Sequence, residues 1–535
     1  MSQTADVVVA GAGHNSLITA AYLAKAGYEC VVLDARAIPG GGAATEELLL
    51  PGYKIDSCST GHTLIQVNPL LTEDELGLKA DYGLEYLEPD PVGHVGFPDG
   101  EQLTMWLDLD RTLAEFARFS ERDADAYGRM IAEYDGVKGA FARARSVPLG
   151  FGPSLEELLL QHPRGRTWLR RNSLSAWDII RREFETPHVR AFMAWMAFQT
   201  LVPLDAPGSG ILAYSLIFGR QRRSWTIPRG GSGALTGALV RVIEDHGGRV
   251  LCGRHVDRLV LEGGRCAGVE TSDGEQFLGR EAVVSTIHVK HLVEMAPAEA
   301  WGEDFVYGVE TYDIGLPGMA AYFATTEPPE FDTPDGPRSA VSAGTVGWAE
   351  DVIQCARDIK DGKPVDGVPW LLVATPTIAD PSRAPEGHHT MKLLSPQAWE
   401  IPTRGRDWDW YKDELADRQL DHLRKYVSNL SDDKIVASFV KSPADIEASN
   451  EHMIHGAFHG GDRSLPFSGR NRPVPGYADH RTPIARLYQT GGTTHPGGSI
   501  TGFPGRNAAT VVLTDLGRDP EEVMSGAGRA RAGSH

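Results

Sequence analysis

A glycine-rich turn between two apolar runs, near the start of the chain, constrains the fold more than any other feature. Residues 7–10 are apolar and lead directly into Gly11-Ala-Gly13, after which apolar residues recur at helical spacing. A second apolar run at residues 31–33 ends in Asp34, 21 positions after Gly13. This order of strand, tight turn, helix and strand predicts a dinucleotide-binding unit, in which the acid contacts ribose hydroxyls.

The residue types of the turn suit a bound pyrophosphate. Gly11 permits the sharp turn, and Gly13 lets backbone N–H groups approach phosphates whose charge the helix N-terminus stabilises. Ser16 stands where the usual fingerprint has a third glycine, and it is small enough to keep helix and strand close. We predict that Ser16 and its neighbours His14 and Asn15 belong to the same cofactor site. A βαβ unit without a ligand is the alternative interpretation.

The segment that follows Asp34, DARAIPGGGAA, resembles a flavoenzyme family. It is similar to the phytoene desaturase-like branch of FAD-dependent oxidoreductases, which is related more distantly to the flavin amine oxidases. In that branch an acid, a basic residue two positions later and a double glycine surround the ribose and diphosphate of FAD. Many relatives carry Arg after the double glycine, and because this chain has Ala43 there, no Arg contact is predicted at that point. The resemblance implies FAD contacts for Asp34, Ala35, Arg36, Gly41, Gly42 and Ala43.

A second glycine-rich junction lies near the C-terminus. Residues 487–492, LYQTGG, read as a strand that ends in glycines, and residues 493–509 enter a helix through another glycine-rich turn. Such a strand-to-helix junction can hold an anion. It closely resembles the closing motif of the same family, in which the helix N-terminus faces the pyrimidine edge of the flavin. The resemblance implies that Gly491 and Gly492 contact the ribityl-phosphate portion and that Ile500, Thr501 and Gly502 lie near the isoalloxazine.

Residues 225–290 are predicted to complete the nucleotide domain. The resemblance implies that the backbone of Val256 contacts the adenine. Gly231-Ser-Gly233 looks like a second dinucleotide loop, but Pro228 interrupts the segment before it and no acid follows at the right distance. The expected elements are a helix at 233–247 and strands at 249–252, 256–261, 266–271, 276–278 and 282–286.

We therefore predict an α/β protein of two interleaved domains. A Rossmann-like FAD-binding domain comprises residues 1–60, 225–290 and 480–520. An α+β substrate-binding domain comprises residues 61–224, which read as mostly helical, and residues 291–479. Residues 521–535 are expected to form a flexible tail. The two most apolar stretches, residues 192–204 and 211–218, pack in the core or form the wall of an apolar substrate tunnel.

Composition excludes several classes of function. The 52 basic and 72 acidic residues give a net charge of −20, which disfavours nucleic acid as a partner. The five cysteines are dispersed, and the chain has neither a signal-peptide pattern nor an apolar run of spanning length, so we expect a cytoplasmic protein. Contact of the apolar stretches with a membrane surface stays an alternative, and the oligomeric state is left open. His452, His455 and His459 have helical spacing, but the glycines among them indicate a loop, and no metal site is predicted.

The sequence predicts one complete dinucleotide unit, without a second for NAD(P)H and without a redox dithiol. The leading hypothesis is an FAD-dependent dehydrogenase or desaturase. It removes hydride from a C–H bond of a mainly apolar substrate, isoprenoid or aromatic, to flavin N5, and oxygen, a quinone or another acceptor reoxidises the flavin. His495 is the candidate base, with His62 and His94 as weaker candidates. The alternatives are an amine or alcohol oxidase, a redox-neutral isomerase, and a flavin-stabilised interaction protein with little turnover.

Overall fold

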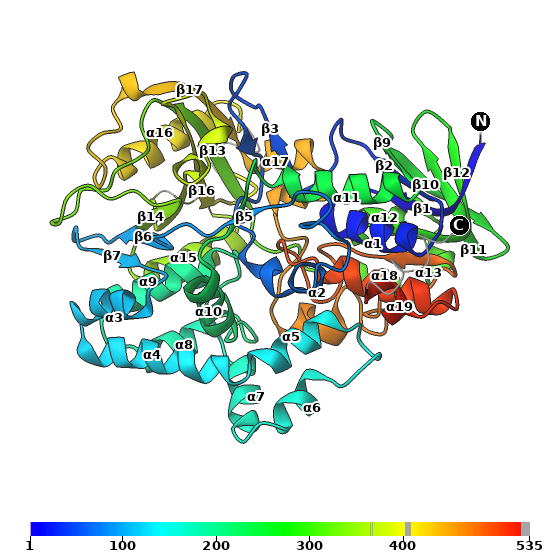
Figure 1. Ribbon diagram of the computed structural model, residues 1–535, viewed down its shortest axis with the longest axis horizontal. Helices are drawn as coiled ribbons and strands as arrows, with labels where there is room; N and C mark the ends of the chain where they lie inside the picture. The colour runs from blue at the N-terminus through cyan, green and yellow to red at the C-terminus, as the bar shows by residue number, and fades with distance from the viewer. Residues whose placement is uncertain (1, 364, 366, 402–407, 526–535) are drawn as a thin grey trace.

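The computed structural model describes residues 2–363, 365, 367–401 and 408–525. Two seven-stranded sheets, towards opposite ends of the molecule, organise these residues (Figure 1). Each sheet takes its strands from segments that lie far apart in the sequence, so the chain passes repeatedly from one end to the other. Among the described residues, no helix combines the length and the apolarity needed to cross a membrane.

The first sheet contains the predicted dinucleotide unit. β1 (Ser2–Ala10) pairs in parallel with β2 (Cys30–Asp34) on one side and with β12 (Gln276–Ser285) on the other. β18 (Leu487–Gln489), which precedes the second glycine junction, pairs in parallel with β12. The two glycine turns therefore follow strands that both neighbour β12. The other strands of the sheet are β9 (Arg249–Cys252), β10 (Val256–Glu262) and β11 (Arg265–Thr271).

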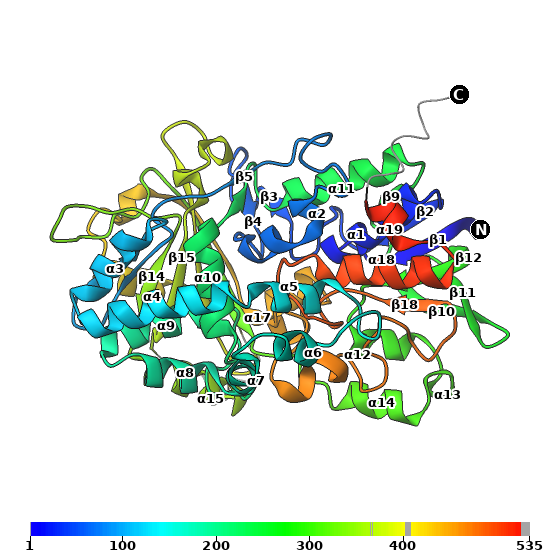
Figure 2. The same ribbon diagram turned by 60° about the horizontal axis from the view of Figure 1, so that its bottom comes forward.

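Helices cover both faces of the first sheet. α1 (His14–Lys25), α11 (Gly233–Asp245) and α18 (Phe503–Asp515) pack their apolar side chains against one face. α18 lies beside α1 in both views, although the two helices come from opposite ends of the chain (Figure 1, Figure 2). Side chains from three further helices join the core of the other face. These are α12 (Val289–Leu292), α13 (Ala298–Trp301) and α14 (Glu303–Glu310).

Two strands predicted separately, at residues 276–278 and 282–286, form a single strand, β12. Its first residues pair antiparallel with β11, while its full length follows β1 in parallel. A register shift between Ala5 and Val7 accommodates both pairings. Gly279 lies opposite this shift, where an added Cβ would approach the Ala282 carbonyl oxygen to 2.5 Å. A local irregularity within one strand thus has the sequence signature of a turn.

The second sheet has the strand order β17-β13-β16-β15-β14-β6-β7. The segment at 93–105 was expected to be mostly helical, and that prediction is wrong there, because β6 pairs in parallel with β14 from far along the chain. The strands are β6 (Gly93–Gly96), β7 (Gln102–Met105), β13 (Gly318–Thr325), β14 (Ser342–Val346), β15 (Trp370–Ala374), β16 (His389–Pro396) and β17 (Ile435–Lys441).

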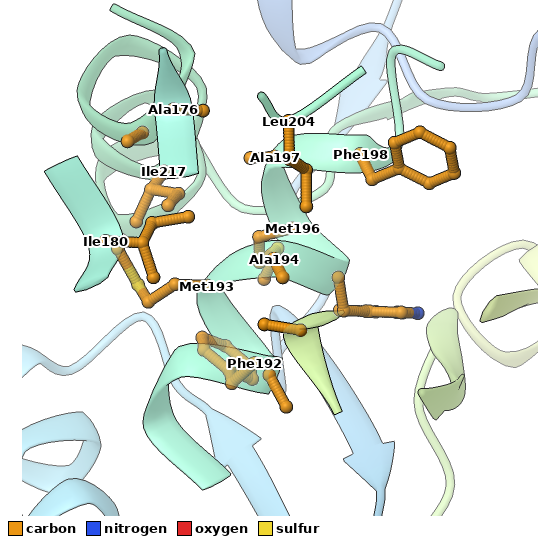
Figure 3. Packing of buried hydrophobic residues seen from close by; sticks show 14 of the residues in the cluster. Ala176, Ile180, Phe192, Met193, Ala194, Met196, Ala197, Phe198, Leu204 and Ile217 are labelled. Atoms are coloured by element: carbon orange, nitrogen blue, oxygen red, sulfur yellow. The ribbon is translucent and has the colours of Figure 1, made fainter. Parts of the chain in front are cut away.

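Helices pack against the second sheet, and α9 (Pro187–Phe198) lies deepest among them. The Trp195 Nε1–H donates to the Leu371 carbonyl at 3.0 Å, and the Trp370 Nε1–H donates to the Trp195 carbonyl at 3.1 Å. Figure 3 shows residues of α9 packed among apolar side chains of α8 and α10. The others are α3 (Leu109–Ala117), α4 (Glu121–Asp135), α5 (Lys138–Ser146), α6 (Leu155–Leu160), α7 (Gly165–Ser173), α8 (Ala176–Glu183), α10 (Leu212–Arg223), α15 (Ala349–Lys360) and α16 (Tyr411–Leu423).

Short elements connect the two ends of the molecule. A terminal helix, α19 (Pro520–Met524), occupies the start of the segment expected to be a flexible tail, and residues 526–535 of that segment lie outside the described residues. The remaining short elements are α2 (Pro69–Thr72), α17 (Pro443–Ser449) and the paired strands β3 (Thr45–Glu46) with β4 (Ile55–Asp56) and β5 (Tyr86–Leu87) with β8 (Ile227–Pro228).

Candidate cofactor and substrate cavity

A cavity of about 610 Å³ is lined by residues from both ends of the molecule. Cavities that bind small molecules usually measure about 300–1,000 Å³. We call the part formed by the glycine turns and the β10–β12 segment the nucleotide half. We call the part formed by α10, β15, β16 and the loop that precedes α10 the substrate half.

The two glycine turns meet at one side chain, that of Thr286. Gly11 has φ +92°, and a Cβ on it would lie 2.4 Å from Thr286 Cγ2. Gly491 has φ +99°, and a Cβ on it would lie 2.4 Å from Thr286 Oγ1. Only glycine adopts such a backbone conformation without cost, and only glycine leaves this space free. The fold therefore brings together, across Thr286, two turns that are 480 positions apart.

The N-terminus of α1 faces the cavity with its donors uncapped. Gly13 is the N-cap residue, no side chain accepts from the first turn, and that turn contains no acid. Gly13, His14 and Asn15 line the cavity. The Ser16 hydroxyl instead donates to the carbonyls of Gly11 at 2.5 Å and Gly13 at 2.9 Å, so it stabilises the turn from behind. Free N–H groups at a helix N-terminus suit an anionic ligand such as a pyrophosphate.

Asp34, at the end of β2, is a cavity-lining acid that is 9% exposed. Its carboxylate accepts from the N–H groups of Ala12 at 2.6 Å and Arg36 at 2.9 Å, which fixes it beside the first glycine turn. Burial raises the pKa of this carboxyl. The Arg36 guanidinium donates to the Gly41 carbonyl at 3.0 Å, so it also holds the double-glycine loop in place.

The second junction is anchored to α1 through Gly505. The Thr19 hydroxyl donates to the Gly505 carbonyl at 2.9 Å, and a Cβ on Gly505 would come within 2.3 Å of the Asn15 carbonyl oxygen. Arg506, one residue later, forms an ion pair with Glu75 at 2.8 Å in a largely buried position. These contacts hold the start of α18 against the start of α1.

The structure divides the predicted cofactor residues into two sets. The residues that line the cavity are Gly11, Gly13, His14, Asn15, Asp34, Ala35, Arg36, Gly41, Gly42, Val256, Gly491, Gly492 and Ile500. The residues that do not are Ser16, Ala43, Thr501 and Gly502. The last two lie beneath the junction, where the Thr501 carbonyl accepts from Asn68 Nδ2 at 2.9 Å and the space beside Gly502 is closed by Asn68, Ile18 and Ile65.

The predicted base His495 is not among the cavity-lining residues. It is buried, and desolvation lowers its pKa to about 3, so the ring is neutral. His62 lies in a buried contact with Ser232 Oγ at 2.9 Å, and His94 contacts Thr104 Oγ1 at 2.9 Å. The cavity wall contains none of the three. Sequence proximity to the glycine junction did not reveal on which side of the loop the ring of His495 lies.

Sequence reasoning missed two cations of the substrate half, Lys392 and Arg220. Lys392 Nζ donates to the Cys58 carbonyl at 2.6 Å and to Thr60 Oγ1 at 2.8 Å, and burial lowers its pKa. Both residues line the cavity. The only available signal was a single cation within an otherwise apolar segment, in HTMKLLSP and ILAYSLIFGR.

Two other sequence features have a structural explanation. At the Gly231-Ser-Gly233 turn, Asp56 Oδ1 accepts from the Ser232 N–H at 2.8 Å, so the protein's own carboxylate occupies the helix start. This geometry agrees with the interpretation that the turn is no second dinucleotide loop. His452 and His459 line the cavity, and His455 lies in a turn at φ +54°. In the described part of the chain, no group of three His, Cys, Asp or Glu side chains is arranged to hold a metal ion.

Comparison with known proteins identifies the family. The model of a family described as flavin containing amine oxidoreductase matches residues 17–513. The chain belongs to this family. This amine oxidoreductase family member is an FAD-dependent oxidoreductase, and its cofactor is FAD. The predicted resemblance to the phytoene desaturase-like flavoenzymes and the predicted Rossmann-like α/β fold are confirmed.

Relatives of this flavin oxidoreductase match it along almost its full length. One of the two limonene dehydrogenase chains of Castellaniella defragrans is 26% identical, with 97% of each chain covered. Phytoene desaturase (lycopene-forming) of Pseudescherichia vulneris is 27% identical, with 95% of this chain and 98% of the relative covered. Among solved structures, putrescine oxidase superposes with a TM-score of 0.61 at 14% identity, covering 96% of this chain and 99% of that one.

The residues of the nucleotide half fit FAD. The space beside Gly11 and Gly491 would be filled by any Cβ, the first turn of α1 offers unpaired donors, and Asp34 is a fixed acid at the end of β2. These are the features that a dinucleotide with a pyrophosphate and a ribose requires. FAD, when bound, supplies an acceptor for hydride.

Proposed function

We propose that the protein is a dehydrogenase or desaturase that removes hydride from a C–H bond of a mainly apolar substrate, isoprenoid or aromatic in kind. The observation that carries this proposal is the composition of the substrate half. Apolar side chains suit a large apolar ligand and keep water from the reacting carbon. Those that line the cavity are Leu201, Leu216, Trp225, Leu372, Leu394 and Phe458.

The names of two relatives support this class of substrate. One belongs to a limonene dehydrogenase and the other is a phytoene desaturase, and both match this chain over more than nine-tenths of its length. We extend to this protein only the apolar character of those substrates. Oxygen, a quinone or another soluble acceptor would then take the electrons away.

Amine oxidation is the main alternative, since two solved structures of similar fold are named putrescine oxidase and cyclohexylamine oxidase. Lys392 and Arg220 argue against it. A protonated amine would meet like charges inside a poorly solvated cavity, where repulsion is weakly screened. The substrate half therefore favours a substrate without a cationic group.

Lys392 is our candidate for the proton acceptor. Forming a double bond from two C–H bonds releases one hydride and one proton. Lys392 is titratable and lines the substrate half, and burial lowers its pKa, so its neutral amine becomes available closer to neutral pH. In this role it replaces His495, which does not line the cavity.

Anaerobic reduction tests the proposal directly. The purified, FAD-loaded protein is mixed without oxygen with limonene, with an aromatic hydrocarbon or a terpene alcohol, and with putrescine or cyclohexylamine, and the loss of flavin absorbance is followed. Bleaching by the apolar compounds and not by the amines is the expected result. Addition of oxygen or a soluble quinone then identifies the acceptor that restores the colour. Bleaching by amines alone would contradict the proposal.

A further inference from the structure

Three arginine side chains of the described chain are buried, and one of them lacks an oxygen partner. Arg383 forms an ion pair with Asp56 at 2.8 Å. Arg472 donates to several backbone carbonyls, among them that of Asp462 at 2.6 Å. For Arg220, the contact found within the described residues is that of Nη1 with the Met196 sulfur at 3.0 Å, and Nε has no acceptor there. A thioether is a weak acceptor and carries no compensating charge.

Arg220 lies in the wall of the substrate half. It belongs to α10, is 5% exposed, and lines the cavity together with Leu216, one turn earlier on the helix, and Trp225, just beyond its end. Burial alone lowers its pKa to about 9, which leaves the guanidinium cationic at neutral pH. A buried cation without a counter-charge is unfavourable, and it persists when something else supplies the missing charge.

The acids of the same cavity are engaged elsewhere. Asp34 accepts from the Ala12 and Arg36 N–H groups in the nucleotide half. Glu451 is exposed and contacts His255 at 3.0 Å. Within the described residues, no carboxylate forms an ion pair with Arg220. The counter-charge is therefore expected from a molecule that enters the cavity.

We infer that the substrate carries a carboxylate and that Arg220 binds it. This inference rests on the proposed function and narrows its substrate class to an apolar molecule with one acidic group. A guanidinium matches a carboxylate in charge and in the geometry of its donors, and such a contact is stronger among apolar neighbours than in water. Arg220 would bind one end of the substrate, while the leucines and Phe458 of the substrate half contact its apolar body.

Binding to the FAD-loaded protein tests this inference without requiring turnover. The probes are two matched pairs, cyclohexanecarboxylate with cyclohexylmethanol and geranate with geraniol. Dissociation constants come from calorimetry and from changes in flavin absorbance. The wild-type protein should bind each carboxylate more tightly than its alcohol. Arg220→Met should weaken the carboxylates about 10- to 100-fold, the worth of a charged hydrogen-bonded contact, and leave the alcohols nearly unchanged.

Two further variants keep the test decisive. Arg222→Met removes the same charge from an exposed position on the same helix and should leave all four probes unaffected. Arg220→Lys retains the charge but not the planar donors, so it should weaken the carboxylates less than Arg220→Met does. It also covers the case in which the methionine variant fails to fold.

The outcomes separate this inference from the proposed function. If wild-type protein binds alcohols as tightly as carboxylates, or if Arg220→Met binds carboxylates as wild type does, the inference is wrong. If Arg220→Met changes only FAD affinity or the flavin spectrum, Arg220 serves the cofactor and the inference is also wrong. Bleaching by neutral apolar compounds would in those cases leave the proposed function intact. Carboxylate binding without bleaching by any C–H donor would sustain the inference and contradict the proposed function.

Discussion

The nucleotide half and the substrate half of the cavity are built by different means. The nucleotide half consists mainly of backbone, with Gly11 and Gly491 packed on Thr286 and the uncapped start of α1 beside them. The substrate half consists of apolar side chains with two cations, Arg220 and Lys392. Backbone donors recognise a cofactor that the family shares, whereas side chains can be exchanged to fit one substrate. The difference indicates which half should tolerate change.

The largest effect should come from Gly491→Ala. The new Cβ would clash with Thr286 Oγ1, and φ +99° is unfavourable for alanine. Strain and overlap of about 2 kcal/mol each predict roughly 1,000-fold weaker FAD binding. The measurement is FAD retained on purification and its affinity for the apoprotein. If Gly491→Ala binds FAD normally, the nucleotide half does not depend on its backbone shape.

Two controls make this test specific. Gly274→Ala places alanine at φ +79° with no atom within 4 Å of its Cβ, so it should lose about 1 kcal/mol of stability and keep FAD. Thr286→Ser removes the Cγ2 that an alanine at 11 would meet and keeps the hydroxyl that an alanine at 491 would meet. We therefore expect Thr286→Ser to rescue part of the FAD binding of Gly11→Ala but not that of Gly491→Ala.

A smaller effect, confined to the substrate half, is expected for Lys392→Met. Loss of a positioned proton acceptor should slow anaerobic bleaching about 100-fold while FAD remains bound. With the neutral amine as acceptor, the wild-type rate should rise with pH through the lysine pKa, which burial has lowered. Lys392→Arg keeps the cation but cannot release its proton, so it should be as slow as Lys392→Met. A fast Lys392→Arg variant would show that charge alone matters at this position.

The smallest effect concerns two histidines that do not line the cavity, His480 and His495. Burial lowers their pKa values to about 4 and about 3. Below about pH 6.5 the unfolded chain binds protons that the folded chain does not, so the free energy of unfolding should fall as the pH decreases. At pH 5 the loss should be about 2 kcal/mol for each histidine, measured by urea unfolding with FAD present.

The variant His495→Asn separates a structural role from a catalytic one. It should reduce the dependence of stability on pH, because one buried imidazole has been removed. It should leave the rate of anaerobic bleaching unchanged, since His495 does not line the cavity. Slow bleaching by His495→Asn would restore this residue as the candidate base.

Predictability followed the range of the interactions. The first βαβ unit and the strand at 249–252 were predictable, because each has local turn chemistry and a clear apolar pattern. The strand β6 was not, because its partner β14 lies more than 240 residues later and its own composition does not favour a strand. The roles assigned to individual FAD contacts stay predictions, while their positions on the cavity wall come from the fold.

The sequence by itself determined that this chain has a dinucleotide-binding unit, a second glycine junction and a family resemblance that names FAD, because short-range backbone geometry requires particular residue types. Only the tertiary structure decided that both junctions touch Thr286, that His495 does not reach the cavity, and that Lys392 and Arg220 do. Burial, charge compensation and the direction of a side chain depend on neighbours from distant segments, and no local pattern encodes them.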